Sequence, residues 1–245
     1  MRMLGKVLVG AVPVIALLVA AAFLPVSPSA LLLRQLVLAA IGIGGIMVAE
    51  RLLFGGTWGR GVTTIGFTAP QPRAVIVAVI CGLPMWLFLP VYGSLNGIPV
   101  GLQLDWMSIL LGVILVNGLA EEAIHRGFIF GHLRREHSFI AAACLSAAIF
   151  AAQHLYLMLT IGTLPGIASV ALAALLAFPL AFMFERGGNS IAAPAILHTS
   201  SNAPVMLFAL PPEMGSVLLP HMGVVLVSIY LCFAFSRWLP KAKSV

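Results

Sequence analysis

The chain has 245 residues, of which 61% are hydrophobic and only 8% are charged, and its mean hydropathy is +1.12. Soluble domains carry about 25% charged residues, so this composition excludes an ordinary soluble globular protein and is typical of a polytopic membrane protein. The net charge of +6 comes from Lys and Arg residues at the ends of apolar runs, where they act as topology signals in a lipid bilayer, and no nucleic-acid partner is expected.

Eight apolar segments, each long enough to cross a bilayer, follow one another along the chain. They are separated by short clusters of Gly, Pro and Asn, which are typical of loops. The pattern predicts an all-α fold, namely a polytopic helical bundle that forms a single transmembrane domain over residues 1–245. The predicted spans are residues 6–24, 31–53, 74–95, 105–133, 138–159, 165–184, 189–209 and 217–238.

The first segment also has the arrangement of a secretory signal peptide, with basic residues, then an apolar run, then small residues. Its apolar run, residues 7–24, is longer than the roughly 7–15 residues of a usual signal-peptide core. We therefore interpret it as a first membrane span, with removal as a signal peptide as the alternative.

The basic residues alternate along the chain. Lys and Arg occur before the first predicted span and after the second, fourth, sixth and eighth, whereas the intervening loops contain none. Under the positive-inside rule this alternation predicts an integral membrane protein with both termini in the cytoplasm. Arg34, near the start of the second span, is the exception, and we expect its side chain to snorkel to the interface.

Three of the predicted spans carry polar side chains at membrane depth. Such residues are costly in lipid and usually face the interior of a bundle. At a rise of 1.5 Å per residue they lie about 15–25 Å from the basic ends of their spans, near the middle of a core roughly 30 Å thick. Side chains from separate helices are therefore expected to meet. They are Glu121, Glu122 and Arg126 in the fourth span, His154 in the fifth, and His198 and Asn202 in the seventh.

A carboxylate, imidazoles and an amide in a water-excluding bundle are suited to hydrolysis. Glu122 and Arg126 are four residues apart and can pair on one helix face. Glu121 points about 100° away from Glu122, so it is left without that cation and is the candidate base that takes a proton from water. His and Asn donors aimed at one point suit a developing oxyanion.

Other intramembrane protease designs are excluded by the sequence. The chain has no HExxH pattern, and its single aspartate, Asp105, cannot form an aspartyl dyad. Two alternatives from other classes stay open. One is a non-catalytic membrane protein, such as a bacteriocin-immunity factor or a partner scaffold, and the other is a proton- or ion-coupled transporter that uses the cluster as a relay.

Three short stretches carry a family resemblance. EEAIHR, residues 121–126, resembles the EExxxR motif of the CAAX-protease and bacteriocin-processing (CPBP, or Abi) family of glutamic intramembrane endopeptidases. FAAQH, residues 150–154, resembles the FxxxH motif of that family, and HTSSN, residues 198–202, resembles its HxxxN motif. The resemblance covers roughly residues 105–210, which are the expected catalytic core.

The resemblance implies an enzyme that hydrolyses a peptide bond of a membrane-associated peptide or protein, such as a CaaX-type tail, a leader peptide or a C-terminal sorting signal. It implies that Glu121 and His154 activate the attacking water and that His198 and Asn202 hold the oxyanion. Glu122 and Arg126 would order the site.

No catalytic metal is implied by the resemblance. If a divalent metal such as zinc were bound, Glu121, His154 and His198 would be its ligands. His125 departs from the family pattern, and we expect it either to tune Glu121 or to line the cavity.

Overall fold

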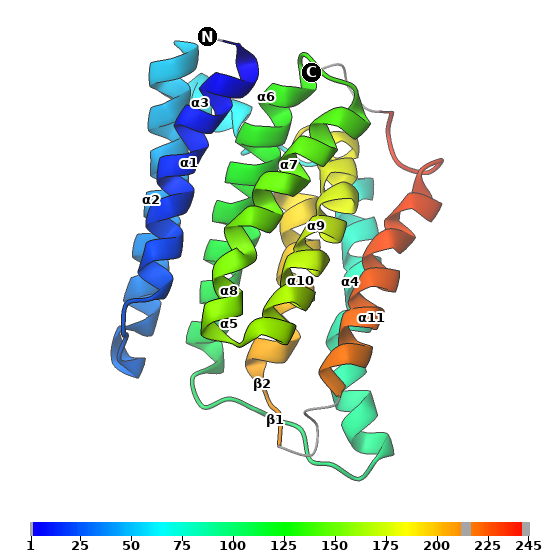
Figure 1. Ribbon diagram of the computed structural model, residues 1–245. Helices are drawn as coiled ribbons and strands as arrows, with labels where there is room; N and C mark the ends of the chain where they lie inside the picture. Colours follow the sequence, from blue (N-terminus) through cyan, green and yellow to red (C-terminus); the bar gives the residue numbers. More distant parts are fainter. Residues whose placement is uncertain (1, 212–216, 242–245) are drawn as a thin grey trace.

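The computed structural model describes residues 2–211 and 217–241, which form an all-α bundle (Figure 1). Among these residues, seven helices are long and apolar enough to cross a membrane. They are Met3–Ala22, Leu31–Phe54, Pro72–Leu95, Trp106–Arg134, Phe139–Thr160, Thr163–Arg186 and Leu218–Phe235. The predicted fold class, an all-α polytopic membrane bundle, is confirmed.

Several of these spans are divided into shorter elements. The elements are α1 (Met3–Ala22), η1 (Pro28–Ala30), α2 (Leu31–Phe54), α3 (Trp58–Thr64), α4 (Pro72–Leu95), β1 (Gly101–Leu102), α5 (Trp106–Val113), η2 (Ile114–Ala120), η3 (Ala123–Phe130), α6 (Gly131–Arg134), α7 (Phe139–Gln153), η4 (His154–Tyr156), α8 (Leu157–Thr160), α9 (Thr163–Arg186), α10 (Ala192–Leu207), β2 (Phe208–Ala209), α11 (Leu218–Tyr230) and η6 (Leu231–Phe235). We call the continuous run α5, η2, η3 and α6 the motif helix, because it carries EEAIHR.

The predicted seventh span, residues 189–209, is represented by the shorter helix α10, which has 16 residues. The helix stops because the chain becomes extended at Phe208, where β2 pairs antiparallel with β1. At 1.5 Å per residue α10 is about 24 Å long. The predicted count of eight spans is therefore approximate, since seven helices meet the length of a full span.

The motif helix and α10 occupy the interior of the bundle. The helix α10 packs against α4, α9 and η2, and α2 packs along η2 and η3. Figure 1 shows α1 and α2 together at one edge of the bundle, with α4 and α11 at the other. Every residue of the motif helix from Ala120 to Leu133 is buried, so its ionisable side chains are shielded from lipid on all sides.

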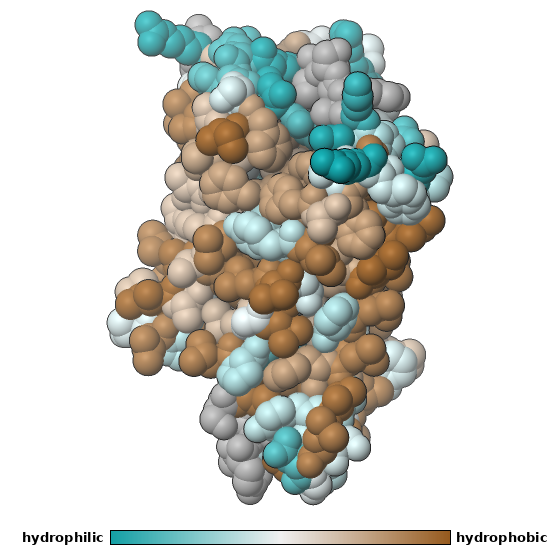
Figure 2. Space-filling view, turned by 90° about the vertical axis from the view of Figure 1, so that its right-hand side faces the viewer, coloured by the Kyte–Doolittle hydropathy of each residue, from teal (hydrophilic) through white to brown (hydrophobic). Residues whose placement is uncertain are grey.

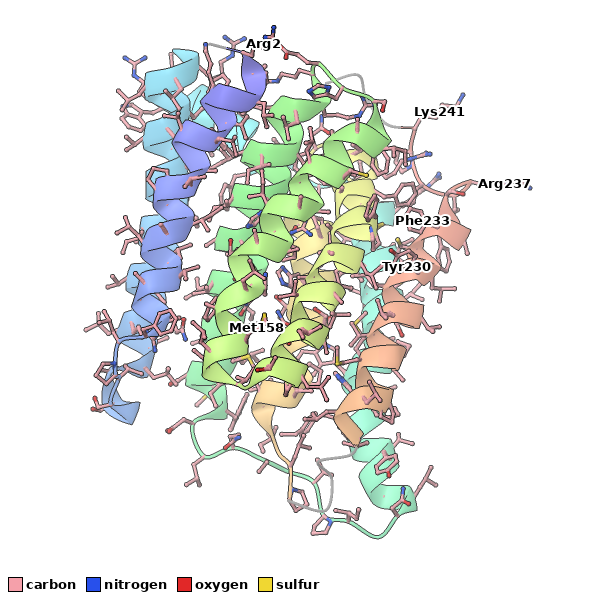
Figure 3. The ribbon with its side chains drawn as sticks, in the orientation of Figure 1. Arg2, Met158, Tyr230, Phe233, Arg237 and Lys241 are labelled. Atoms are coloured by element: carbon pink, nitrogen blue, oxygen red, sulfur yellow. The ribbon has the colours of Figure 1, made fainter. Side chains whose placement is uncertain are left out.

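The polar groups of the surface gather at one end of the molecule. Arg2, Arg237 and Lys241 all lie at the upper end of the bundle (Figure 3). Figure 2 shows hydrophilic residues concentrated at this same end and a mostly hydrophobic surface below it. The two ends of the described chain therefore lie on the same side of the apolar region.

A buried pair fastens α2 to the motif helix near this polar end. The Nε2 atom of His132 lies 2.6 Å from Oε2 of Glu50, and both side chains are buried. The ring of Phe54 stacks on His132 with 3.7 Å between the ring centroids. Because α1 packs on α2 and also on η3 and α6, these contacts hold the first two helices against the motif helix.

Gly127 allows the motif helix to approach the chain that follows α3. A Cβ atom at position 127 would overlap the backbone carbonyl of Ile65, which cannot rotate away as a side chain can. Gly44 offers a matched contrast, because a Cβ atom there would meet no heavy atom within 4 Å.

We predict that Gly127→Ala lowers the free energy of unfolding by about 1–3 kcal/mol, the usual cost of overpacking a close contact. Gly44→Ala is the control and leaves stability unchanged or slightly raised, since alanine favours helices. Thermal unfolding of both purified variants in detergent micelles measures the effect. Equal midpoints for Gly127→Ala and the unmodified protein would contradict the packing described for this glycine.

Candidate active site

The two adjacent glutamates lie between stretches of unusual backbone. Ile114–Ala120 and Ala123–Phe130 are π-helical, and Glu121 and Glu122 join them. A π-helix makes i→i+5 hydrogen bonds, is rare, and frequently occurs at functional sites. The motif helix is thus wider than an ordinary α-helix on both sides of the carboxylates.

Glu122 is the centre of a buried ionic network. Its side chain is 0% exposed, and its Oε1 atom accepts a hydrogen bond from Nη1 of Arg126 at 2.9 Å. The same oxygen lies 2.7 Å from Nδ1 of His198, which comes from α10. A carboxylate that is hydrogen-bonded in this way holds an imidazole in one tautomer and one orientation. Glu122 and Arg126 therefore fix the orientation of the His198 ring.

Glu121 points to a different part of the interior. Its Oε1 atom accepts a hydrogen bond of 3.2 Å from Nδ2 of Asn117, one turn earlier in the same helix. Its Oε2 atom lies 3.9 Å from Nε2 of His198 and is buried without a hydrogen-bond partner among the described residues. One oxygen of Glu121 is thus anchored, and the other is available for chemistry.

His154 lies directly after α7, where the chain tightens into the 3₁₀ turn η4. Its Nδ1 atom lies 2.7 Å from the carbonyl oxygen of Phe150 and donates to it. With the proton on Nδ1, the Nε2 atom of the neutral ring is an acceptor. His154 is therefore prepared to receive a proton at Nε2.

The ring of Phe150 supports three of the polar side chains. It lies edge-on to His154 and His198, with centroids 4.7 Å and 5.7 Å away. The guanidinium carbon of Arg126 lies 4.5 Å from its centroid. An aromatic face attracts a cation and excludes water, so Phe150 both packs the two imidazoles and stabilises Arg126.

One cavity of about 380 Å³ connects the polar side chains. Four of the six predicted site residues line it: Glu121, His154, His198 and Asn202. The other two, Glu122 and Arg126, lie in the network that holds His198. The structure therefore brings together side chains from three separate spans, as their estimated depths predict. Apolar residues of α1, α2 and α9 complete the wall.

The position of the His125 side chain could not be predicted from the sequence. It is fully buried, and its Nε2 atom lies 2.7 Å from Oε1 of Gln153 on α7. The expectation that it lines the cavity is wrong, because its side chain is directed at α7 instead. Gln153 itself lines the cavity and precedes His154, so the pair ties the motif helix to the segment that presents His154.

Sequence reasoning missed several further cavity residues, among them Gln153 and Tyr156. Their signal was weak, because each is a single polar or aromatic side chain within two residues of His154. Arg34, which is expected to snorkel to the interface, also lines the cavity, and its Nη2 atom donates to the carbonyl oxygen of Ala21, in the last turn of α1, at 2.7 Å.

The cavity does not present a metal-ligand set. Within residues 2–211 and 217–241, no three His, Cys, Asp or Glu side chains converge as ligands of one ion. Of the three ligands expected if zinc were bound, His154 and His198 direct Nδ1 to protein acceptors, which leaves Nε2 of each ring free, and Glu121 is hydrogen-bonded to Asn117 through one oxygen.

Comparison with known proteins agrees with the motifs. No curated protein and no solved structure matches the chain. A family model described as "Type II CAAX prenyl endopeptidase Rce1-like" matches residues 103–204. This segment contains all three motifs, and the match confirms that the chain has the CAAX-protease resemblance that EExxxR, FxxxH and HxxxN predict.

Proposed function

We propose that this protein is a CAAX-type intramembrane endopeptidase that hydrolyses a peptide bond of a membrane-associated substrate with water activated by Glu121. The observation that carries the proposal is the buried cavity in which Glu121, His154, His198 and Asn202 converge from three spans. The family match supports the class of activity, and the cavity supports the roles of individual residues.

The Oε2 atom of Glu121 is the group that activates water. This atom is buried and has no hydrogen-bond partner among the described residues, so it is placed to take a proton from a water molecule in the cavity. Nε2 of His154 is a second acceptor on the same cavity and orients that water. The water oxygen then attacks the carbonyl carbon of the scissile bond.

The developing oxyanion requires donors, and His198 and Asn202 supply them. His198 donates from Nδ1 to Glu122, and the proposed mechanism requires a second proton on Nε2, which donates into the cavity. The charges balance before the attack, because Glu121 and Glu122 offset His198 and Arg126, and after it, because the oxyanion carries the negative charge that Glu121 has lost. The Asn202 amide is the second donor. When the C–N bond breaks, the proton held by Glu121 passes to the leaving nitrogen.

The proposal also covers the extent of the catalytic core, the orientation of the chain in the membrane and the class of substrate. We place the catalytic core in residues 105–210 of one transmembrane domain. We also propose that the end carrying Arg2, Arg237 and Lys241 faces the cytoplasm, because positive residues are retained on that side. The substrate is a CaaX-type tail, a leader peptide or a C-terminal sorting signal, each of which brings a peptide bond to the membrane.

We predict that Glu121→Gln and His154→Ala each lower the rate of peptide cleavage about 10²–10⁴-fold, the usual contribution of a general base or its partner. Hydrolysis of a fluorogenic farnesylated CaaX peptide by the full chain in proteoliposomes measures the rate. Glu136→Gln is the matched control, because Glu136 is an exposed glutamate in the loop after α6 and retains full activity. Full activity in Glu121→Gln would overturn the mechanism.

Glu122 and Arg126 lead to a different prediction. Arg126→Met leaves the buried Glu122 charge without its guanidinium, so we expect the free energy of unfolding to fall by about 3–5 kcal/mol. The double variant Glu122→Gln/Arg126→Met removes both charges and should recover much of that loss, yet stay inactive because His198 is no longer held. Thermal unfolding and peptide cleavage are measured on the same samples. Additive destabilisation, or an active double variant, would refute the ordering role.

A further inference from the structure

Arg34 is a cation inside the cavity that the hydrolytic chemistry does not use. It belongs to the first turn of α2, and its side chain is partly buried. Its one hydrogen bond goes from Nη2 to the carbonyl oxygen of Ala21, which leaves other guanidinium donors uncommitted. Among the described residues no carboxylate forms an ion pair with Arg34, whereas Arg126 and Arg134 each have such a partner.

The position of Arg34 on its helix adds to the positive potential. The first turn of a helix exposes backbone N–H groups and carries a partial positive charge, so it favours anions and disfavours cations. No acidic side chain lies in the first turn of α2. Gln35, the next residue, also lines the cavity and offers a further hydrogen-bonding group. This end of the cavity is therefore suited to an anionic group of a ligand.

The distance from Arg34 to the reacting groups follows from the packing of α2 on the motif helix. A Cβ atom on Gly42 would lie 3.0 Å from Cβ of Ala120, and one on Gly112 would lie 2.7 Å from Cγ of Gln35. The two helices therefore run parallel, with Gly42 level with the residue before Glu121. Arg34 lies eight residues before Gly42, which is about 12 Å along the helix axis.

We propose that Arg34 binds the free C-terminal carboxylate of the peptide substrate and so selects peptide bonds near a C-terminus. An extended peptide advances about 3.3–3.6 Å per residue, so about 12 Å corresponds to three or four residues between the scissile bond and the carboxylate. The cavity wall between the two levels includes the aliphatic side chains of Leu38 and Val116, which suit aliphatic side chains of a substrate. This inference rests on the proposed peptidase function and makes Arg34 a specificity-determining residue.

The test compares two farnesylated CaaX peptides that differ only in a C-terminal acid or amide. Cleavage is measured with the full chain in proteoliposomes of zwitterionic lipid. We expect the acid to be preferred about tenfold to a hundredfold, mainly through KM, as is usual for a charge-assisted hydrogen bond. Arg34→Gln should abolish this preference by raising KM for the acid to the value for the amide. Arg60→Gln is the control, because Arg60 is exposed on α3 and outside the cavity.

Binding provides a readout that does not need cleavage. Fluorescence anisotropy with the Glu121→Gln variant measures the affinity of both peptides. Equal binding of the acid and the amide would overturn the role of Arg34 while leaving the peptidase function intact, whereas binding of neither peptide would refute the CaaX-type substrate and the role of Arg34 with it. The alternative anion is a lipid headgroup. If the acid and the amide bind alike, and anionic lipid displaces the acid whereas neutral lipid does not, then Arg34 binds the headgroup and the proposal is wrong.

Discussion

The arrangement of the interior depends on one buried oxygen. Oε1 of Glu122 accepts hydrogen bonds from Arg126 on its own helix and from His198 on α10. A buried carboxylate is tolerated only when it is paired and hydrogen-bonded, so this oxygen both requires and fixes its two partners. Through it, the motif helix and α10 are locked at a depth where His198 also faces Glu121.

The two adjacent glutamates have different proposed roles because their surroundings differ. Glu122 is fully enclosed and engaged, whereas Glu121 has one oxygen bonded to Asn117 and the other directed to the cavity. In the proposed mechanism the first carboxylate stabilises the geometry of the site, and the second exchanges a proton with substrate or water. Two residues of α7 connect to this arrangement. Phe150 packs against the ring of His154, and Gln153 is hydrogen-bonded to His125.

The sequence predicted much of this because polar residues in lipid are rare and therefore informative. The depth of Glu121, His154 and His198 followed from helix rise alone, and the pairing of Glu122 with Arg126 followed from their spacing. Other features needed three-dimensional contacts. The π-helical backbone around the glutamates, the short α10 and the direction of His125 are set by packing between helices, which local pattern does not encode. The place of Arg34 in the cavity wall also depends on packing, because α1 and α2 together bring its side chain there.

The central claim is that Glu121 makes this cavity a peptidase that acts on membrane-associated substrates. Comparing the protein termini of membranes from cells that express the native chain with those from cells that express Glu121→Gln tests it most directly. The account predicts new termini, close to membrane-attached segments, that are present only with the native chain. Identical sets of termini in the two membranes, at equal protein levels, would contradict it.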